Sequence, residues 1–264
     1  MSVAQKEWPR RGRILMAGIN STNAEFGEKA RLSKSVALVT GGSRGIGRAI
    51  AERLAVLGAS VAICGRDRAA LAESAGAIEK LGTRSFFQMT DVTDAARVTE
   101  LVSKTEAKLG PITILVNSAG MGLFGPAHEK TEGDWDRVLD TNLKSIFLVS
   151  RAVIPSMIRR GAGDIINISS LAGRNTFAGG GIYCASKWGL MGLSGCMAED
   201  LREYGIRVSV ICPGSVATEF SGRGPKNASK ALQAEDVAHA VEAIVTQGPV
   251  SFLSEIHVRP LRKP

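Results

Sequence analysis

A tyrosine and a lysine four residues apart, in the stretch "GIYCASKWG", could act together in proton transfer. Tyr183 and Lys187 share one face if the stretch is helical, because residues i and i+4 are neighbours on a helix surface. A free tyrosine has a pKa of about 10, and a fixed ammonium group nearby lowers it by favouring the phenolate. The pair suggests a proton donor and the cation that tunes it, although such a pair is also common on solvated helix faces.

Two further polar residues could assist the same reaction. Ser170 ends the apolar stretch "GDIINISS", where its hydroxyl could hold a substrate carbonyl oxygen beside the Tyr183 hydroxyl. Asn142, in "LDTNLKS", could anchor a water that connects Lys187 with bulk solvent. Each residue also has a plain structural interpretation: Ser170 as the cap of a turn, and Asn142 as a buried, hydrogen-bonded amide.

A glycine-rich segment, "TGGSRGIG" at residues 40–47, lies between an apolar stretch and an amphipathic one. Glycines there permit a tight turn, let a pyrophosphate approach the backbone, and let the following helix pack on the strand. The start of that helix offers N–H groups and partial positive charge, so the segment predicts a dinucleotide site. The predicted contacts are Gly41, Ser43, Arg44, Gly45, Ile46 and Gly47.

The residues after the second apolar stretch favour NADP(H) over NAD(H). An NAD-selective site usually has an acid there that binds the ribose 2′-hydroxyl, but this chain has Gly65 followed by Arg66. Arg66 and Arg44 could both pair with a 2′-phosphate. In the alternative interpretation both arginines are solvated and Asp67 is a displaced acid.

The third apolar stretch ends in "TDVT", which could bind the adenine ring. The carboxylate of Asp91 can accept from the adenine amino group, and the backbone of Val92 can pair with the ring. A turn aspartate that caps the next helix is the alternative. Asp94 is well placed for that capping, which leaves Asp91 freer to bind a ligand.

Apolar stretches alternate with helical periodicity along the chain from Val36. We expect strands at residues 36–40, 60–64, 85–93, 112–120, 163–170, 206–214 and 254–260. We expect helices at residues 48–58, 69–82, 95–110, 135–160, 183–205 and 234–247. Because the strands are continuously apolar, both faces of the sheet should be covered. The predicted fold is α/β, a Rossmann-type doubly wound parallel sheet of about seven strands with helices on both faces.

Composition bounds the remaining possibilities. The 264 residues carry a net charge of +8, half of it in the first 34, so we expect a basic extension at 1–33 and one catalytic domain at 34–264. The extension could touch an acidic surface, but elsewhere no basic stripe with interleaved aromatics indicates nucleic-acid binding. We expect no membrane partner, because no apolar run approaches the about 20 residues needed to cross a bilayer. Four cysteines without a CxxC pair or a His/Cys cluster, and a start without a secretory h-region, suggest a cytoplasmic protein with reduced thiols and no metal.

Taken together, these residues resemble the short-chain dehydrogenase/reductase family, in its short single-domain branch, over residues 35 to about 260. The segments that carry the resemblance are "TGGSRGIG", "DVT", "NSAG" at 117–120, "YCASK" and "PGSVAT" at 213–218. The resemblance implies a Rossmann fold and a catalytic tetrad of Asn142, Ser170, Tyr183 and Lys187. It also implies a homodimer or homotetramer.

The resemblance extends to further cofactor contacts. Asn117, Ala119 and Gly120 match the motif that stabilises the central strand and borders the adenosine ribose. The matches to the segment that embraces the nicotinamide amide and phosphate are Pro213, Gly214, Val216 and Thr218. Tyr183 and Lys187 would contact the cofactor as well. Pocket walls are expected from residues 121–124, from residues 171–177 and from Phe220 onward, and their composition is mixed.

The expected function is that of an NADP(H)-dependent oxidoreductase that interconverts a ketone or aldehyde with an alcohol, with Tyr183 as proton donor. The ending "SEIHVRPLRKP" differs from that of many ketoacyl-reductase-like members and is more similar to members that act on small alcohols and hydroxy acids. The alternatives are a 3-oxoacyl-thioester reductase acting on acyl carrier protein or coenzyme A esters, a sugar epimerase, and a non-catalytic NADP(H)-binding sensor. The segment after Thr218 is short for a two-helix lid, and its Arg223, Lys226 and Lys230 could attract an anion, although a solvated loop is simpler.

Overall fold

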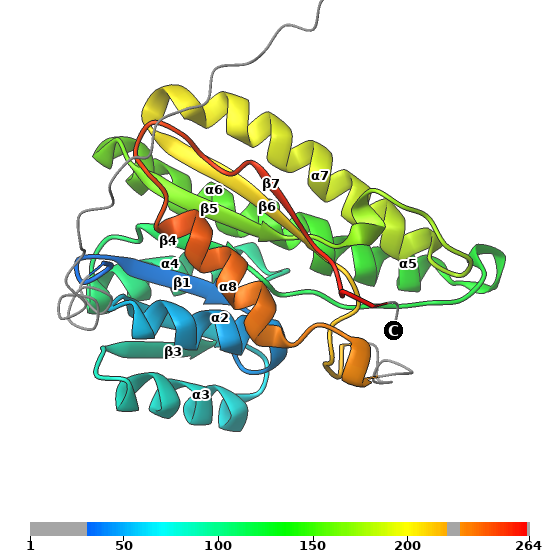
Figure 1. The fold of residues 1–264 in the computed structure, drawn as a ribbon, viewed down its shortest axis with the longest axis horizontal. Coiled ribbons are helices and arrows are strands. Elements are labelled where there is room, and N and C mark those ends of the chain that lie inside the picture. The colour runs from blue at the N-terminus through cyan, green and yellow to red at the C-terminus, as the bar shows by residue number, and fades with distance from the viewer. Residues whose placement is uncertain (1–30, 221–227, 263–264) are drawn as a thin grey trace, which may run out of the picture.

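A computed structural model describes residues 31–220 and 228–262, and these contain one parallel sheet of seven strands (Figure 1). The strands are β1 Val36–Thr40, β2 Ser60–Gly65, β3 Ser85–Met89, β4 Ile114–Asn117, β5 Gly163–Ile168, β6 Ile206–Pro213 and β7 Glu255–Val258. Their order across the sheet is β3-β2-β1-β4-β5-β6-β7. The order reverses between β1 and β4, which confirms the predicted doubly wound sheet and puts a ligand crevice at the carboxyl ends of the strands.

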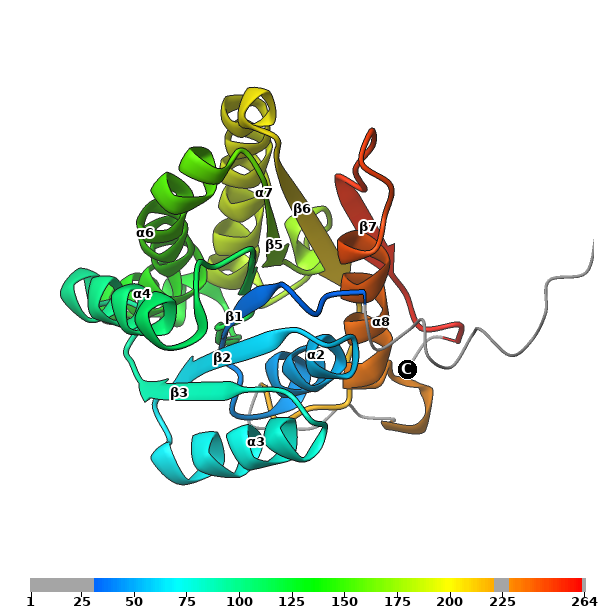
Figure 2. The ribbon, with the colours of Figure 1, turned by 90° about the vertical axis from the view of Figure 1, so that its left-hand side faces the viewer.

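Helices cover both faces of this sheet. They are α2 Gly45–Val56, α3 Arg68–Lys80, α4 Ala95–Leu109, α5 Glu132–Leu139, α6 Ser145–Arg160, α7 Gly181–Leu201 and α8 Ala234–Val245. Short helical turns are η1 Ala127–Glu129, η3 Leu171–Gly173, η4 Arg202–Tyr204 and η5 Ala228–Lys230. Figure 2 shows α2, α3 and α8 on one side and α4, α6 and α7 on the other. No described helix is long and apolar enough to cross a bilayer.

Each face of the sheet has its own hydrophobic core. In β1, Ala37 and Val39 pack with the residues of α2, α3 and α8, whereas Val36 and Leu38 pack with those of α4 and α6. Successive side chains of a strand point to opposite faces, so a strand between two helical layers must be apolar at every position. This is the physical reason for the continuous apolar stretches in the sequence.

Several strands are shorter than expected: β3 ends at Met89 rather than at residue 93, and β4 ends at Asn117 rather than at residue 120. Two further differences concern a helix and the start of the domain. The single helix expected over 135–160 is interrupted by a π-helical turn, η2 Asp140–Lys144, between α5 and α6. Leu32 is buried in the core, and its N–H donates to the Leu57 carbonyl, so the folded domain includes residues just before position 34. Residues 1–30 of the expected extension, and Arg223 and Lys226, lie outside the described residues.

Candidate active site

The glycine-rich segment forms a tight loop between β1 and α2. Gly41 and Gly45 have φ angles of 69° and 54°, in the left-handed region that glycine tolerates best. A Cβ atom on Gly47 would lie 2.2 Å from the Gly41 carbonyl oxygen, and one on Gly41 would lie 2.9 Å from the Cα atom of Ala119. The loop is therefore packed against both α2 and the segment after β4, and no side chain fits at these positions.

The amino end of α2 has the chemistry of an anion site. Its cap residue, Arg44, makes no side-chain capping bond, and the first turn contains no acid. Within the described part of the chain, the backbone N–H groups of residues 43–47 have no hydrogen-bond acceptor. By contrast, Asp67 and Asp94 cap α3 and α4 through their carboxylates. The free N–H groups of α2 fit a pyrophosphate, because they are oriented along the helix dipole.

The two arginines expected at the ribose both lie at this loop's open side. Arg44 and Arg66 are exposed, and the nearest ion-pair partner of Arg44 is the exposed Glu219 at 3.9 Å. Asp67, the alternative ribose acid, accepts a hydrogen bond from the Ala70 N–H as the cap of α3. Asp67 thus serves as a helix cap, whereas both arginine side chains are exposed.

Asp91 is partly engaged by its own turn. Its Oδ1 atom accepts from the N–H and the hydroxyl of Thr93, and these bonds lower the pKa of the carboxyl. Arg66 and Arg97 lower it further through their charges. Val92 is buried, and Asp94 caps α4 as expected. The second oxygen of Asp91 accepts no bond from the described residues, so one acceptor faces outward for a ligand.

The segment after β4 joins the two halves of the sheet. Asn117 donates to Asn167 of β5 at 2.9 Å and to Ser150 of α6 at 3.2 Å. The N–H of Ala119 donates to the Thr40 hydroxyl. This network holds the carboxyl ends of β1, β4 and β5 in one register, which agrees with the strand-stabilising role that the family resemblance implies for Asn117.

Asn142 is fully buried in the π-helical turn. Its Oδ1 accepts from the Met121 N–H at 2.8 Å, and its amide donates to the Met121 carbonyl and to the Ser186 hydroxyl. Both amide hydrogens are thus used inside the protein. The expected water anchor would have to use the remaining lone pair of Oδ1 or the backbone, and the side chain mainly fastens the turn to the segment after β4. A Cβ on Gly120 would lie 3.3 Å from Oδ1, so this backbone passes close to the amide.

Tyr183 and Lys187 lie on the buried face of α7, as their spacing predicts. The Lys187 Nζ atom lies 5.9 Å from the centre of the Tyr183 ring and donates to the Ile168 carbonyl at 2.9 Å. Burial raises the pKa of the Tyr183 phenol to about 12 and lowers the pKa of the Lys187 ammonium to about 8. The expected lowering of the Tyr183 pKa by Lys187 is absent from this arrangement, because desolvation dominates. A phenol with this pKa holds its proton at neutral pH.

Ser170 lies at the end of β5, next to the Tyr183 phenol. Its Oγ accepts from the Ala172 N–H as the cap of η3. The Ser170 hydroxyl also forms a hydrogen bond with the Tyr183 phenol. This bond lowers the pKa of the phenol, but burial raises it by more. The structural and functional interpretations of Ser170 are therefore compatible.

The segment after β6 returns to the glycine loop. Pro213 ends β6, and the Gly214 N–H donates to the Val258 carbonyl of β7. Val216 forms an isolated bridge with Leu232, and a Cβ on Gly45 would lie 3.4 Å from the Thr218 methyl group. The structure thus brings the predicted cofactor segments together at one edge of the sheet.

Several residues at this edge were not among the predicted site residues. Thr40 and Ser186 are the hydrogen-bond partners of Ala119 and Asn142. Single serines and threonines next to a motif carry no distinguishing signal in a sequence. The predicted pocket walls are more aromatic than expected, because Phe124 and Phe220 both contact the Tyr183 ring.

A cluster of possible metal ligands lies behind Ser170. The sequence spacing indicates no His/Cys cluster, but the parallel register of β6 and β7 places His257 beside Cys212. Their donor atoms and one of Glu255 lie within 4.8 Å of one another. Arg174 already holds Glu255 through two hydrogen bonds, and burial raises the pKa of the Cys212 thiol to about 11. A protonated thiol and a paired carboxylate are poor ligands, and we assign no metal to this cluster.

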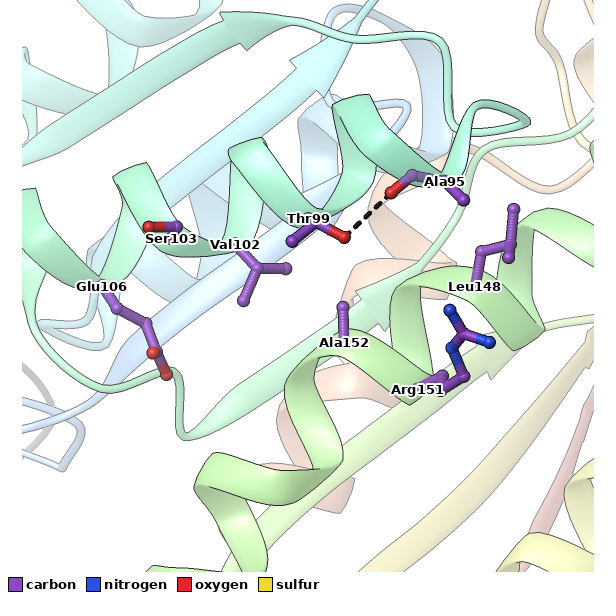
Figure 3. Close-up of a pocket in the computed structure, with 8 residues that line it drawn as sticks. All are labelled: Ala95, Thr99, Val102, Ser103, Glu106, Leu148, Arg151 and Ala152. Carbon is purple, nitrogen blue, oxygen red and sulfur yellow. Dashed lines mark hydrogen bonds between the residues drawn. The ribbon is translucent and has the colours of Figure 1, made fainter.

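A surface hollow of about 410 Å³ lies elsewhere, between α4 and α6 (Figure 3). Its lining residues are Ala95, Thr99, Val102, Ser103, Glu106, Leu148, Arg151 and Ala152. None of them is a predicted site residue. The side chains that could perform chemistry converge at the carboxyl ends of the strands, and we place the reaction there.

Comparisons with known proteins agree with this geometry. The family model described as short chain dehydrogenase matches residues 35–228. An uncharacterised oxidoreductase of Staphylococcus saprophyticus is 39% identical over 235 residues, which cover 87% of this chain and 99% of that protein. A (3R)-3-hydroxyacyl-CoA dehydrogenase of Canis lupus familiaris is 36% identical and covers 82% of this chain and 91% of its own length. The crystal structure of a metagenomic short-chain oxidoreductase in complex with NADP has a TM-score of 0.79 and 40% identity, and covers 88% of this chain and 100% of its own.

Proposed function

The chain belongs to the short-chain dehydrogenase/reductase family, and we propose that it is an NADP(H)-dependent oxidoreductase that interconverts a ketone or aldehyde with the corresponding alcohol. The observation that carries this proposal is the pair of Tyr183 and Lys187 on the buried face of α7, with Ser170 beside the phenol. When bound, the cofactor would supply or accept the hydride. The protein must then supply the proton and hold the carbonyl oxygen.

The residues present fit NADP(H). The uncapped amino end of α2 offers N–H groups to the pyrophosphate, and Gly41 and Gly47 let the loop fold tightly at the start of this helix. Arg44 and Arg66 are the groups that we expect to hold the 2′-phosphate. Asp91 would bind the adenine amino group through its free oxygen. The metagenomic relative crystallised with NADP supports the same cofactor here.

The chemistry of the protein's own groups follows from their protonation. Tyr183 holds its proton at neutral pH and would donate it to the substrate oxygen as that oxygen gains charge. The Ser170 hydroxyl would donate a hydrogen bond to the same oxygen and stabilise its charge. Lys187, still largely protonated at pH 7, would place a positive charge near the phenol in the low-dielectric interior. Asn142 would keep the surrounding turn in place.

A 3-oxoacyl-thioester reductase is the second candidate, supported by the dog relative named as a hydroxyacyl-CoA dehydrogenase. It uses the same catalytic groups and differs only in the substrate. A non-catalytic sensor is the candidate of another class, but a sensor has no need of Ser170, Tyr183 and Lys187 together.

The test is an assay of reduced-nicotinamide absorbance with NADPH and NADH in parallel. The substrates are an acetoacetyl thioester, small β-keto esters, aryl ketones, aldehydes and keto-sugars. We expect turnover with NADPH on at least one class. Tight NADPH binding with no turnover on any class would instead favour the sensor.

We further propose a homodimer or homotetramer in the cytoplasm. Trp135 of α5 and Trp188 of α7 are both about half exposed, which suits a subunit contact over these helices. The four cysteines are unpaired, and a reducing compartment is where free thiols are the rule. Size-exclusion chromatography with light scattering tests the assembly.

A further inference from the structure

Three phenylalanines from three different loops meet around Tyr183. Phe124 follows β4, Phe177 follows η3, and Phe220 follows β6. The ring of Phe124 lies 5.4 Å from the Tyr183 ring at 70°, and that of Phe220 lies 5.9 Å from it at 63°. Phe177 lies 5.9 Å from Phe124. These are favourable edge-to-face or tilted arrangements for aromatic rings.

The exposure of these rings is unusual for large apolar side chains. Phe124, Phe177 and Phe220 are 42%, 49% and 43% exposed, whereas Tyr183 is only 8% exposed. The phenylalanines therefore cover the proposed proton donor and present apolar surface to solvent beside it. Contiguous exposed apolar surface next to polar catalytic groups is typical of a ligand site.

The backbone holds two of these loops together. The Gly125 N–H donates to the Gly179 carbonyl at 2.8 Å, which links the loop of Phe124 to the loop of Phe177. Gly122 lies between two of the rings, because a Cβ there would come within 2.9 Å of both Phe124 and Phe220. The aromatic rings are thus packed against fixed backbone and form a preformed wall.

The charged groups near this wall are mostly engaged elsewhere. Arg174 pairs with Glu255 in a two-bond ion pair, and the Lys187 ammonium is buried against the Ile168 carbonyl. Lys130 packs its ammonium against Gly125, on the loop of Phe124. Of the cations discussed here, Lys130 is therefore the one that could pair with an anionic substrate. An apolar substrate would instead pack against the three phenylalanine rings.

We propose that the natural substrate carries an aromatic or similarly flat apolar group next to its carbonyl, bound by Phe124, Phe177 and Phe220 with the carbonyl oxygen at Tyr183 and Ser170. This inference rests on the proposed function and names the substrate class of that site. An aryl group on the carbonyl carbon fits because rings stack edge-to-face on rings, and because burial of apolar area is the main source of affinity that these walls offer.

The experiment compares three ketones that differ in one substituent: an aryl methyl ketone, a short dialkyl ketone and an α-keto acid. We expect kcat/KM with NADPH to be at least about tenfold higher for the aryl ketone than for the other two. Phe177→Ala and Phe124→Leu should each lower kcat/KM for the aryl ketone by about tenfold, mainly through KM, and lower it more than kcat/KM for the dialkyl ketone, so that the preference between the two ketones falls. Tyr204→Ala is the matched control, because Tyr204 is an aromatic residue of the same exposure as Phe177, on η4 near the start of β6.

Preference for the α-keto acid, lost in Lys130→Met and unaffected by the phenylalanine variants, would overturn the inference and leave the proposed function intact. The absence of turnover with every ketone would count against the proposed function instead. In that case calorimetric binding of an aryl alcohol to the NADPH complex still decides the inference, since binding that persists unchanged in Phe177→Ala would overturn it. NADPH affinity should be the same in all variants, which separates substrate effects from misfolding.

Discussion

The first half of the sheet and the second half build their parts of the site from different materials. Around β1 and α2 the site consists of backbone: glycines with no room for a Cβ, and N–H groups that find no acceptor among residues 31–220 and 228–262. Around β4, β5 and α7 it consists of buried side chains that are hydrogen-bonded to one another, such as Asn117 with Asn167 and Asn142 with Ser186. The backbone half is suited to a ligand with phosphate charge, and the side-chain half is suited to moving one proton.

The two halves also differ in the desolvation cost of their polar groups. A glycine loop needs only the absence of side chains, and it presents its N–H groups at little desolvation cost because they face outward. The catalytic half buries Lys187, Asn142 and Tyr183 in a region where each polar group needs a partner. We therefore expect variants of the side-chain half to affect activity and stability together, and variants of the open phosphate side to affect mainly cofactor binding.

The largest expected effect is at Tyr183, the proposed proton donor. Tyr183→Phe removes the phenol hydroxyl but keeps the ring that packs on Phe124 and Phe220. Loss of a general acid should lower kcat by about 10³-fold. NADPH affinity, measured by fluorescence titration, should change little. Near-full turnover in this variant would show that another group supplies the proton.

The next largest effect is expected in the backbone half. In Gly47→Ala the new methyl group would meet the Gly41 carbonyl at 2.2 Å, so the loop must move. We expect about 1–3 kcal/mol of destabilisation and at least about 100-fold weaker NADPH binding. Gly76→Ala in α3 is the control, because nothing lies within 4 Å of its Cβ, and it should stabilise the protein by about 0.5–1 kcal/mol. Equal NADPH affinity in both variants would contradict the predicted loop.

Asn142 tests whether the side-chain half couples stability to activity. Asn142→Ala leaves the Met121 N–H and carbonyl without their partners inside the protein. We expect a loss of about 1–3 kcal/mol in the free energy of unfolding and a lower kcat. Asn142→Asp keeps the acceptor for the Met121 N–H and should recover part of the stability. A stable but inactive Asn142→Ala protein would point to a direct role in proton transfer instead.

The sequence predicts the local features of the site better than the contacts between residues that are distant in the chain. The glycine loop, the alternation of strands with helices and the Tyr183–Lys187 face follow from local spacing, because each is set by neighbours in the chain. The π-helical turn at Asn142 and its bond to Ser186 depend on residues 44 positions apart, and no local pattern indicates them. The same holds for the meeting of Phe124, Phe177 and Phe220, which come from three separate loops, and for the pKa of Tyr183, which depends on burial.

A smaller effect is expected at the open phosphate side. Arg66→Ala removes an exposed guanidinium, so the stability of the free protein should stay within about 0.5 kcal/mol of wild type. If Arg66 holds the 2′-phosphate, the preference for NADPH over NADH should fall by about tenfold or more. Arg68→Ala, at the first residue of α3 and also exposed, is the control. Unchanged preference in Arg66→Ala would assign the selectivity to Arg44 alone.

The smallest effect concerns the pH dependence of stability in the side-chain half. Burial lowers the pKa of Lys187 from its usual value to about 8, so the folded protein binds fewer protons than the unfolded chain between about pH 8 and pH 10. Below pH 8 Lys187 is charged in the folded protein, and the free-energy cost of burying that charge is fully present. Because this cost disappears as Lys187 loses its proton, the wild type should gain stability relative to Lys187→Met as pH rises. We expect a gain of about 1 kcal/mol between pH 7 and pH 9 in urea unfolding. The lost bond to Ile168 adds an offset that does not depend on pH, and the exposed Lys80→Met control should show no such trend. A difference that stays constant with pH would mean that Lys187 is charged throughout this range, and the catalytic half would then contain a permanently buried cation.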